Sequence, residues 1–178
     1  MKRFTLLLLL VGSFAMANAQ AVADKISLHN GKSIDGSVVK VNEYTVVYKF
    51  VNEDAEQTIS KFAVEKIVYG KSGRVENVSE KIVVNGTDDW EKVVMLVDKE
   101  STSGLTKVGE IRGKTSLINY RTAAGSDKTA EEKLKKEAAK NGCQFVIITS
   151  DKDAGLQSSG SMGFGGTQSM KKGVGYKY

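Results

Sequence analysis

Alternating apolar and polar positions over residues 26–69 predict a series of short β-strands separated by turns. The first strand, residues 26–29, runs into Asn30-Gly31, which is a strong signal for a two-residue hairpin turn. The next strand, residues 34–41, contains Gly36, where the missing side chain permits a bend or a bulge. The pattern is one of strand and turn.

The following residues complete a set of five strands. Tyr44, Val46, Tyr48 and Phe50 fall on one face of a strand at period two. After them come a short strand at 57–60, a single helical turn at 61–64 and a last strand at 65–69. Five short strands with a brief turn before the last are the order of an SH3-like barrel, which hides strand edges and buries one face of every strand.

The opening of this region resembles a known group of exported proteins. Residues 24–39 read Asp-Lys-Ile-Ser-Leu-His-Asn-Gly-Lys-Ser-Ile-Asp-Gly-Ser-Val-Val. This is similar to the "D-x-I-x-L-x-N-G-x-x-I-x-G-x-V" opening of small barrels common in exported Bacteroidetes proteins. The resemblance implies a five-stranded SH3-like barrel over residues 24–69 and carries no assigned activity.

A second module is predicted beyond a linker. Residues 70–89 are rich in Gly, Ser, Asn, Asp and Lys and are expected to form the linker, within which 81–84 could add a strand. Residues 90–178 then predict strands at 93–97, 108–112, 143–150 and 170–178, with a helix at 126–142 and a long Gly/Ser loop at 155–169. Thr129 and Glu132 fit a capping box for that helix, and Asn141-Gly142 fits its C-terminal cap.

This β-β-α-β-β order resembles the small envelope domains of the YbjQ-like and RcsF-like group. Residues 107–113 resemble their "K-x-L-G-x-V-x-G", residues 134–148 are similar to their "L-x-x-x-A-x-x-L-G-A-N-x-V-I", and residues 173–176 to a terminal "G-x-A-Y" strand. The paired cysteines and the lipid-attachment cysteine of the sensor lipoproteins are missing, so the resemblance implies the fold and not the sensing role. The expected fold class is α+β, mostly β.

Two runs of the second module are apolar without alternation, at 93–97 and 145–148. Such strands are typical of a sheet buried on both faces, and the single helix covers only one of them. Exposing the other face would cost roughly 25 cal/mol per Å² of apolar surface. We therefore expect that face to form an interface, either between domains or between subunits. The candidate interaction residues are Val94, Leu96, Val146 and Ile148.

Few residues suggest chemistry. The one His, His29, is more typical of a polar surface residue than of a ligand or base, because no second imidazole exists to share a metal. The one Cys, Cys143, follows the C-terminal end of the helix, which does not lower a thiol pKa, so a packed thiol is favoured. An intermolecular disulfide through Cys143 is the alternative in an oxidising compartment.

Two acidic pairs and one glycine-rich loop remain. Asp88-Asp89 and Asp151-Lys152-Asp153 do not match the spacing of a calcium loop. Residues 160–166 contain glycines that could cradle phosphate, but no suitable helix follows and no Lys-Ser/Thr pair completes a P-loop. This loop is interpreted as a mobile hairpin tip, where Met162 and Phe164 offer a candidate docking point.

The N-terminal residues predict export from the cytoplasm. Lys2 and Arg3 precede an apolar run, and Ala17-Asn18-Ala19 supplies an A-x-A site, so residues 1–19 are predicted to be a cleaved signal peptide. The remaining chain carries 24 basic and 21 acidic residues, interspersed, which gives no sign of a nucleic-acid partner. The absence of a cysteine pair favours a bacterial periplasm. The product is expected to be periplasmic or secreted, soluble and without a membrane span.

These observations favour a non-catalytic exported protein of the periplasm or envelope, acting through protein–protein interaction or self-association and without a cofactor. The alternative is a periplasmic protein that binds a small ligand or a metal, with the Asp-rich loops or the barrel mouth as its site. An enzyme ranks third, because the sequence shows no recognisable set of nucleophile, base and orienting group.

Overall fold

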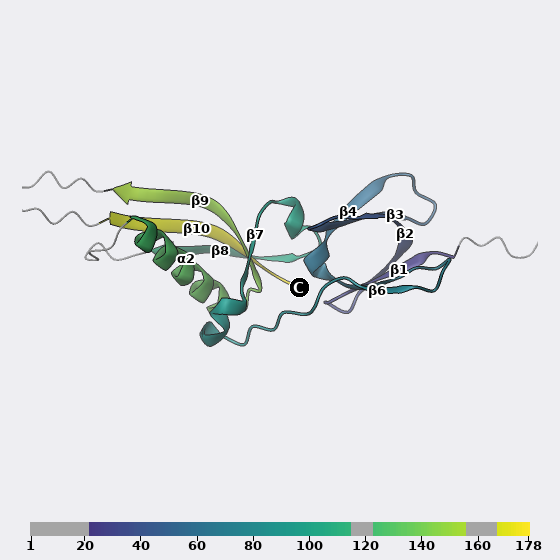
Figure 1. The fold of residues 1–178 in the computed structure, drawn as a ribbon, viewed down its shortest axis with the longest axis horizontal. Coiled ribbons are helices and arrows are strands. Elements are labelled where there is room, and N and C mark those ends of the chain that lie inside the picture. The colour runs from purple at the N-terminus through teal and green to yellow at the C-terminus, as the bar shows by residue number, and fades with distance from the viewer. Residues whose placement is uncertain (1–21, 115–122, 156–166) are drawn as a thin grey trace, which may run out of the picture.

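Two β-sheets lie one after the other along the long axis of the molecule, with one α-helix on the second (Figure 1). The structure is a computed structural model and describes residues 22–114, 123–155 and 167–178. The expected mostly-β, α+β class is confirmed. The predicted signal peptide, residues 1–19, and the loop residues Met162 and Phe164 lie outside the described residues.

The first sheet has six antiparallel strands in the order β4-β3-β2-β1-β5-β6. Its elements are β1 (Asp24–Leu28), β2 (Ser33–Val41), β3 (Thr45–Phe50), β4 (Glu56–Ser60), the 3-10 turn η1 (Lys61–Ala63), β5 (Val64–Val68) and β6 (Val75–Asn77). The first five strands and the turn follow the elements expected from the sequence. The sixth strand was not expected.

The β1–β2 hairpin forms where Asn30-Gly31 predicts it. Gly31 has a φ of +84°, which a glycine adopts without strain, and its N–H donates to the carbonyl of Leu28 at 3.0 Å. The N–H of Leu28 in turn donates to the carbonyl of Lys32 at 2.9 Å. A turn thus begins at Leu28 and ends at Gly31, and Lys32 follows it before β2 begins. The loop is therefore longer than the predicted two residues.

One apolar cluster holds this sheet together. Its fully buried members are Ile26, Val46, Val64 and Ile67. The predicted periodicity of the third strand holds for Val46 and Tyr48, which are buried, but Phe50 at its end is 40% exposed. Burial of the inward face accounts for the alternating pattern seen in the sequence.

The segment predicted as a linker is part of the packed structure. Within residues 70–89, β6 extends the first sheet beside β5, while Ile82 and Val84 pack into the apolar cluster of the second sheet. The possible strand at 81–84 does not form: in the described part of the chain, these residues pair with no other strand. The chain therefore crosses between the two sheets with Ile82 and Val84 turned inward and Val83 exposed.

The second sheet has four strands in the order β7-β9-β10-β8, with β7 parallel to β9 and the other pairs antiparallel. Its elements are the 3-10 turn η2 (Thr87–Lys92), β7 (Val94–Leu96), the 3-10 turn η3 (Glu100–Thr102), β8 (Thr106–Lys114), α2 (Ala123–Lys140), β9 (Phe145–Gly155) and β10 (Thr167–Lys177).

The helix packs on one face of the second sheet, as its sequence pattern predicts. Ala130, Leu134 and Ala138 are completely buried, and Gly142, with a φ of +67°, follows its C-terminal end. The predicted capping box is wrong, because α2 begins at Ala123 and Thr129 lies inside it rather than at its first residue.

The opposite face of the second sheet meets the first sheet at one end. Adjacent residues of a strand point to opposite faces, so Val146 lies under α2 while Phe145 faces away from it. The ring of Phe145 is 5.5 Å from that of Phe62 in η1, and it is completely buried. The two halves of the chain are therefore in contact at this end of the sheet.

A loop from the second half also covers an edge of the first sheet. The N–H of Ser60 donates to the carbonyl of Ser103 at 2.8 Å, and the Ser103 hydroxyl donates to the carbonyl of Thr58 at 2.6 Å. The next residue, Gly104, has a φ of +79°, and a Cβ there would lie 2.6 Å from Cγ1 of Ile59. The polar stretch after β7 thus occupies the outer edge of β4.

We expect a Gly104→Ala substitution to destabilise the protein by about 1–3 kcal/mol, because it imposes a left-handed backbone on alanine and crowds Ile59. Urea unfolding measures the change. Gly109→Ala is the matched control, since a Cβ there meets nothing within 4 Å. Equal effects of the two substitutions would show that the loop is not packed as described.

Candidate functional site

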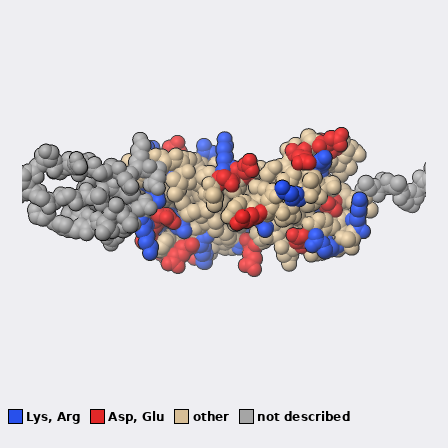
Figure 2. Space-filling model, turned by 45° about the horizontal axis from the view of Figure 1, so that its top comes forward, with Lys and Arg blue, Asp and Glu red and all other residues tan. Residues whose placement is uncertain are grey.

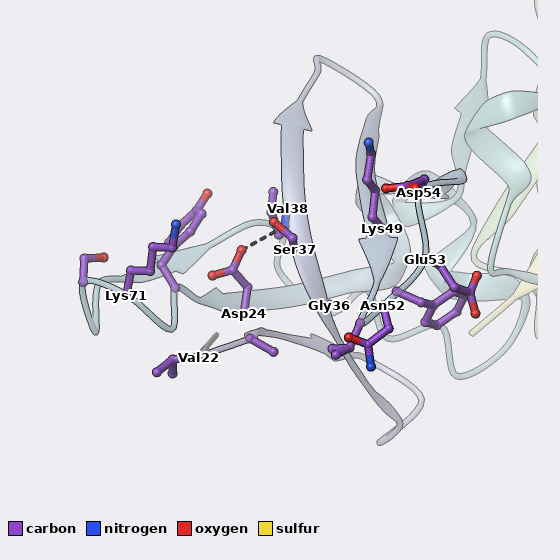
Figure 3. Close-up of a pocket in the computed structure, with 15 residues that line it drawn as sticks. Val22, Asp24, Gly36, Ser37, Val38, Lys49, Asn52, Glu53, Asp54 and Lys71 are labelled. Carbon is purple, nitrogen blue, oxygen red and sulfur yellow. Dashed lines mark hydrogen bonds between the residues drawn. The ribbon is translucent and has the colours of Figure 1, made fainter. Parts of the chain in front are cut away.

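A cleft of about 820 Å³ opens at the end of the first sheet that lies away from the second sheet (Figure 3). It is lined by the start of β1, the middle of β2, the end of β3 and the turns that follow β3 and β5. Lining residues include Val22, Asp24, Lys49, Phe50, Asn52 and Lys71.

Asp24 fixes the base of this cleft. One of its carboxylate oxygens accepts the N–H of Val38 at 2.8 Å, and the other accepts the N–H of Gly70 at 2.9 Å (Figure 3 draws the first). A Cβ at Gly70 would collide with the carbonyls of Val22 and Ala23, so only glycine allows this close approach. The carboxylate of Asp24 thus connects β1, β2 and the turn after β5.

Exposed apolar side chains gather at the rim. Val22 is 62% exposed, Phe50 40% and Val51 49%. Phe50 is held edge-on against Tyr48, with ring centroids 5.3 Å apart. The turn that carries the rim closes through a hydrogen bond from the N–H of Glu53 to the carbonyl of Phe50 at 3.1 Å. Phe50 and Val51 therefore form an apolar ledge at a hydrogen-bonded turn, and Val22 lines the cleft from the start of β1.

Charges of both signs surround this ledge. Lys49, Glu53, Asp54 and Lys71 line the cleft, and Lys49 lies 3.9 Å from Glu56. Figure 2 shows basic and acidic side chains intermingled on one face of the whole molecule, without a large area of either sign. Such a surface can pair with polar groups around an apolar contact, and it does not present a strong field to a charged polymer.

The acidic residues singled out in the sequence serve local structure or lie outside the description. Asp89 accepts the N–H of Asn85 at 2.9 Å and pairs with Lys92 at 2.6 Å; the hydrogen bond from Lys92 is the main reason why its pKa is lowered. The side chains of Asp151 and Asp153 are not among those described. Within the described residues, no three His, Cys, Asp or Glu side chains come together as a metal site.

His29 occupies a second, smaller pocket and corrects the expectation of a surface residue. It is only 8% exposed, and its Nε2 lies 3.0 Å from the hydroxyl of Ser79. That hydroxyl donates to the carbonyl of Val64 at 2.7 Å, so it accepts from His29 rather than giving it a proton. A serine nucleophile needs the reverse arrangement, so this pair is structural as it stands.

Tyr178 joins His29 to the second sheet. Its ring lies 4.9 Å from the imidazole and 5.3 Å from the ring of Phe145, and its hydroxyl accepts the N–H of Ile82 at 3.0 Å. Burial lowers the pKa of His29; nearby Lys81 also lowers it, whereas Glu65 acts in the opposite direction. The imidazole is therefore a neutral part of the junction between the sheets.

Cys143 is a packed thiol. It is completely buried and free, and burial raises its pKa. Its sulfur lies so close to β10 that a Cβ at Gly175 would be 2.6 Å from it. A disulfide to another chain would require this packing to open, so the structure does not support the alternative of an intermolecular thiol.

Most of the predicted interaction residues are occupied inside the chain. Val146 is completely buried under α2 and Ile148 packs beside it, while Leu96 is 6% exposed and Val94 is half-buried. Val146 and Ile148 therefore belong to the core under α2, and an interface between domains or subunits at Val94 and Leu96 stays a prediction. The residues that sequence reasoning missed are those of the cleft rim, where Phe50 ends the partly buried strand β3 and Val51 follows it, both exposed.

No protein-family model matches the chain, and a search of curated proteins finds no match. Among the described residues, no helix is both long enough and apolar enough to cross a membrane.

Acidification is expected to weaken the fold through His29. Because its folded pKa is lowered from 6.5, the unfolded chain binds the extra proton first, and the free energy of unfolding falls as the pH drops through that value. The stability that neutral His29 contributes is lost completely once the pH is below the pKa of His29 in the folded protein. Urea unfolding of the wild type and of His29→Gln at about pH 7.5 and pH 5 measures this effect. If the free energy of unfolding depends on pH equally in the two proteins, His29 does not cause the loss of stability.

Proposed function

We propose that this is a non-catalytic exported protein of the periplasm or cell envelope that acts by binding another protein. The binding surface is the cleft at the end of the first sheet. The observation that carries the proposal is the exposure of three apolar residues that line the cleft, Val22 before β1 and Phe50 and Val51 at the end of β3. Aromatic and aliphatic anchors within a polar surround are typical of the energetic centre of a protein interface.

Two further features support this proposal. The signal-like residues 1–19 and the single cysteine favour export to a bacterial periplasm. The order of five strands with η1 before β5 favours the SH3-like interpretation of the first sheet, in which the cleft lies at the mouth. Val146 and Ile148, first expected at an interface, pack under α2 instead, and on the other face Phe145 contacts Phe62 of the first half. The exposed rim of the cleft is therefore the apolar feature that we propose as the binding surface.

The second candidate is a small ligand in the same cleft. Its volume of about 820 Å³ falls within the range of small-molecule sites. However, its base is closed by Asp24, whose two oxygens are already hydrogen-bonded to the backbone. A small ligand would therefore rely on the rim side chains and on Asn52, Glu53 and Asp54.

Site-specific photo-crosslinking in the host cell tests the proposal. A photoreactive residue in place of Val51 is expected to give a discrete protein adduct, because the rim contacts the partner. The matched control is Val83, which is 51% exposed but lies outside the cleft. Adding Phe50→Ser should reduce the adduct at least about ten-fold, as expected for loss of a central anchor, without changing the melting temperature by more than the control Val83→Ser does.

Equal adducts from positions 51 and 83 would contradict the cleft as the binding surface, and so would an adduct that survives Phe50→Ser. A thermal shift with small envelope molecules that Phe50→Ser removes, in the absence of any protein adduct, would favour the small-ligand candidate instead.

A further inference from the structure

The outer edges of the two sheets are protected unequally. In the described part of the chain, the edge of β4 is covered by Ser103, and the edge strands β6 and β7 are three residues long. At the other end of the strand order, β8 runs for nine residues and, among the described residues, pairs only with β10. β9 is likewise unpaired on one side beyond Ile147, where its pairing with β7 ends, but β8 is open along its whole length. An edge strand of this length presents unpaired backbone N–H and C=O groups to any strand that approaches.

The regular part of β8 is centred on Ile111. Residues from Gly109 to Lys114 pair with β10 without interruption, and the register shifts only around Val108. Ile111 is buried on the face covered by α2, so its neighbours Glu110 and Arg112 point to the opposite face. Their side chains are 73% and 63% exposed and lie 3.8 Å apart in a weak pair along the strand.

The order of charges along β8 matches that of a second copy running in the opposite direction. If two β8 strands pair antiparallel about a two-fold axis at Ile111, Glu110 of each copy lies opposite Arg112 of the other, and Gly109 lies opposite Gly113. Centring the pair on Glu110 places two carboxylates opposite each other, and centring it on Arg112 does the same with two guanidinium groups. Opposite charges directly across a strand pair are favourable and like charges are not.

We propose that β8 is a self-recognition edge, through which two copies of this chain form a symmetric dimer with one continuous eight-stranded sheet. The backbone of the two edges supplies the hydrogen bonds, and the Glu110–Arg112 pairs select the register centred on Ile111. This surface is distinct from the cleft, so the inference goes beyond the proposed function and does not depend on it.

The test is a charge exchange followed by measurement of molecular mass. Sedimentation equilibrium of the secreted form, residue 20 onward, is expected to show a monomer–dimer equilibrium. Glu110→Arg and Arg112→Glu each place two like-charged pairs across the interface and are expected to weaken dimerisation at least about ten-fold. The double variant restores opposite charges and should dimerise like the wild type.

Mixing the two single variants provides a second readout that does not rely on either variant dimerising alone. Every cross-strand pair in the mixed dimer is of opposite charge, so a heterodimer should form at concentrations where each variant is monomeric. Glu131→Lys, which reverses a charge on the exposed side of α2 near Lys135, is the control and should leave the equilibrium unchanged.

Three results would overturn the proposal. The first is a wild-type protein that stays monomeric up to about 1 mM, the weak limit of specific association. The second is a dimer that neither single charge reversal weakens. The third is a mixture of the two single variants that does not associate. A monomer that instead captures an extended peptide of unrelated sequence along β8 would assign the edge to a different partner. Loss of cleft crosslinking with normal dimerisation would affect only the proposed function.

Discussion

The contact between Phe145, Tyr178 and His29 determines how the two sheets are joined. The three rings come from different parts of the chain and follow one another at 4.9 and 5.3 Å, with the Tyr178 ring in the middle. The hydroxyl of Tyr178 also fixes the crossing segment through Ile82. Because the imidazole in this stack is neutral and the other two members are aromatic, the junction buries apolar area without an unpaired charge.

The way in which the two sheets are joined determines which surfaces are covered and which stay exposed. The face of the second sheet that the helix leaves open meets η1 at Phe62, and the loop around Ser103 covers β4. The exposed rim at Phe50 is left at one end of the molecule, and the bare edge of β8 lies in the other half. The two contacts that we propose therefore use different residues.

Local signals in the sequence predicted the local elements. Asn30-Gly31 identified the first hairpin and the spacing of Leu134 with its neighbours identified the helix, since both depend on residues close in the chain. The burial of His29 and the docking of Ser103 depend on residues tens of positions away, so no short pattern indicates them. The cleft rim was missed for a related reason: Phe50 continues the period of a buried strand but is exposed where β3 ends, and the sequence pattern does not mark that change.

The position of β10 in the second sheet has a consequence for how the protein reaches its native state. This strand lies between β8 and β9, and its residue Gly173 is the partner of Ile111, far upstream. Until β10 arrives, β8 has no neighbour in the sheet and the inner side of the helix has only part of its core. Assembly of this half therefore depends on a contact of long sequence separation, which favours slow folding. Until that contact forms, apolar surface and strand edges stay exposed, which favours aggregation.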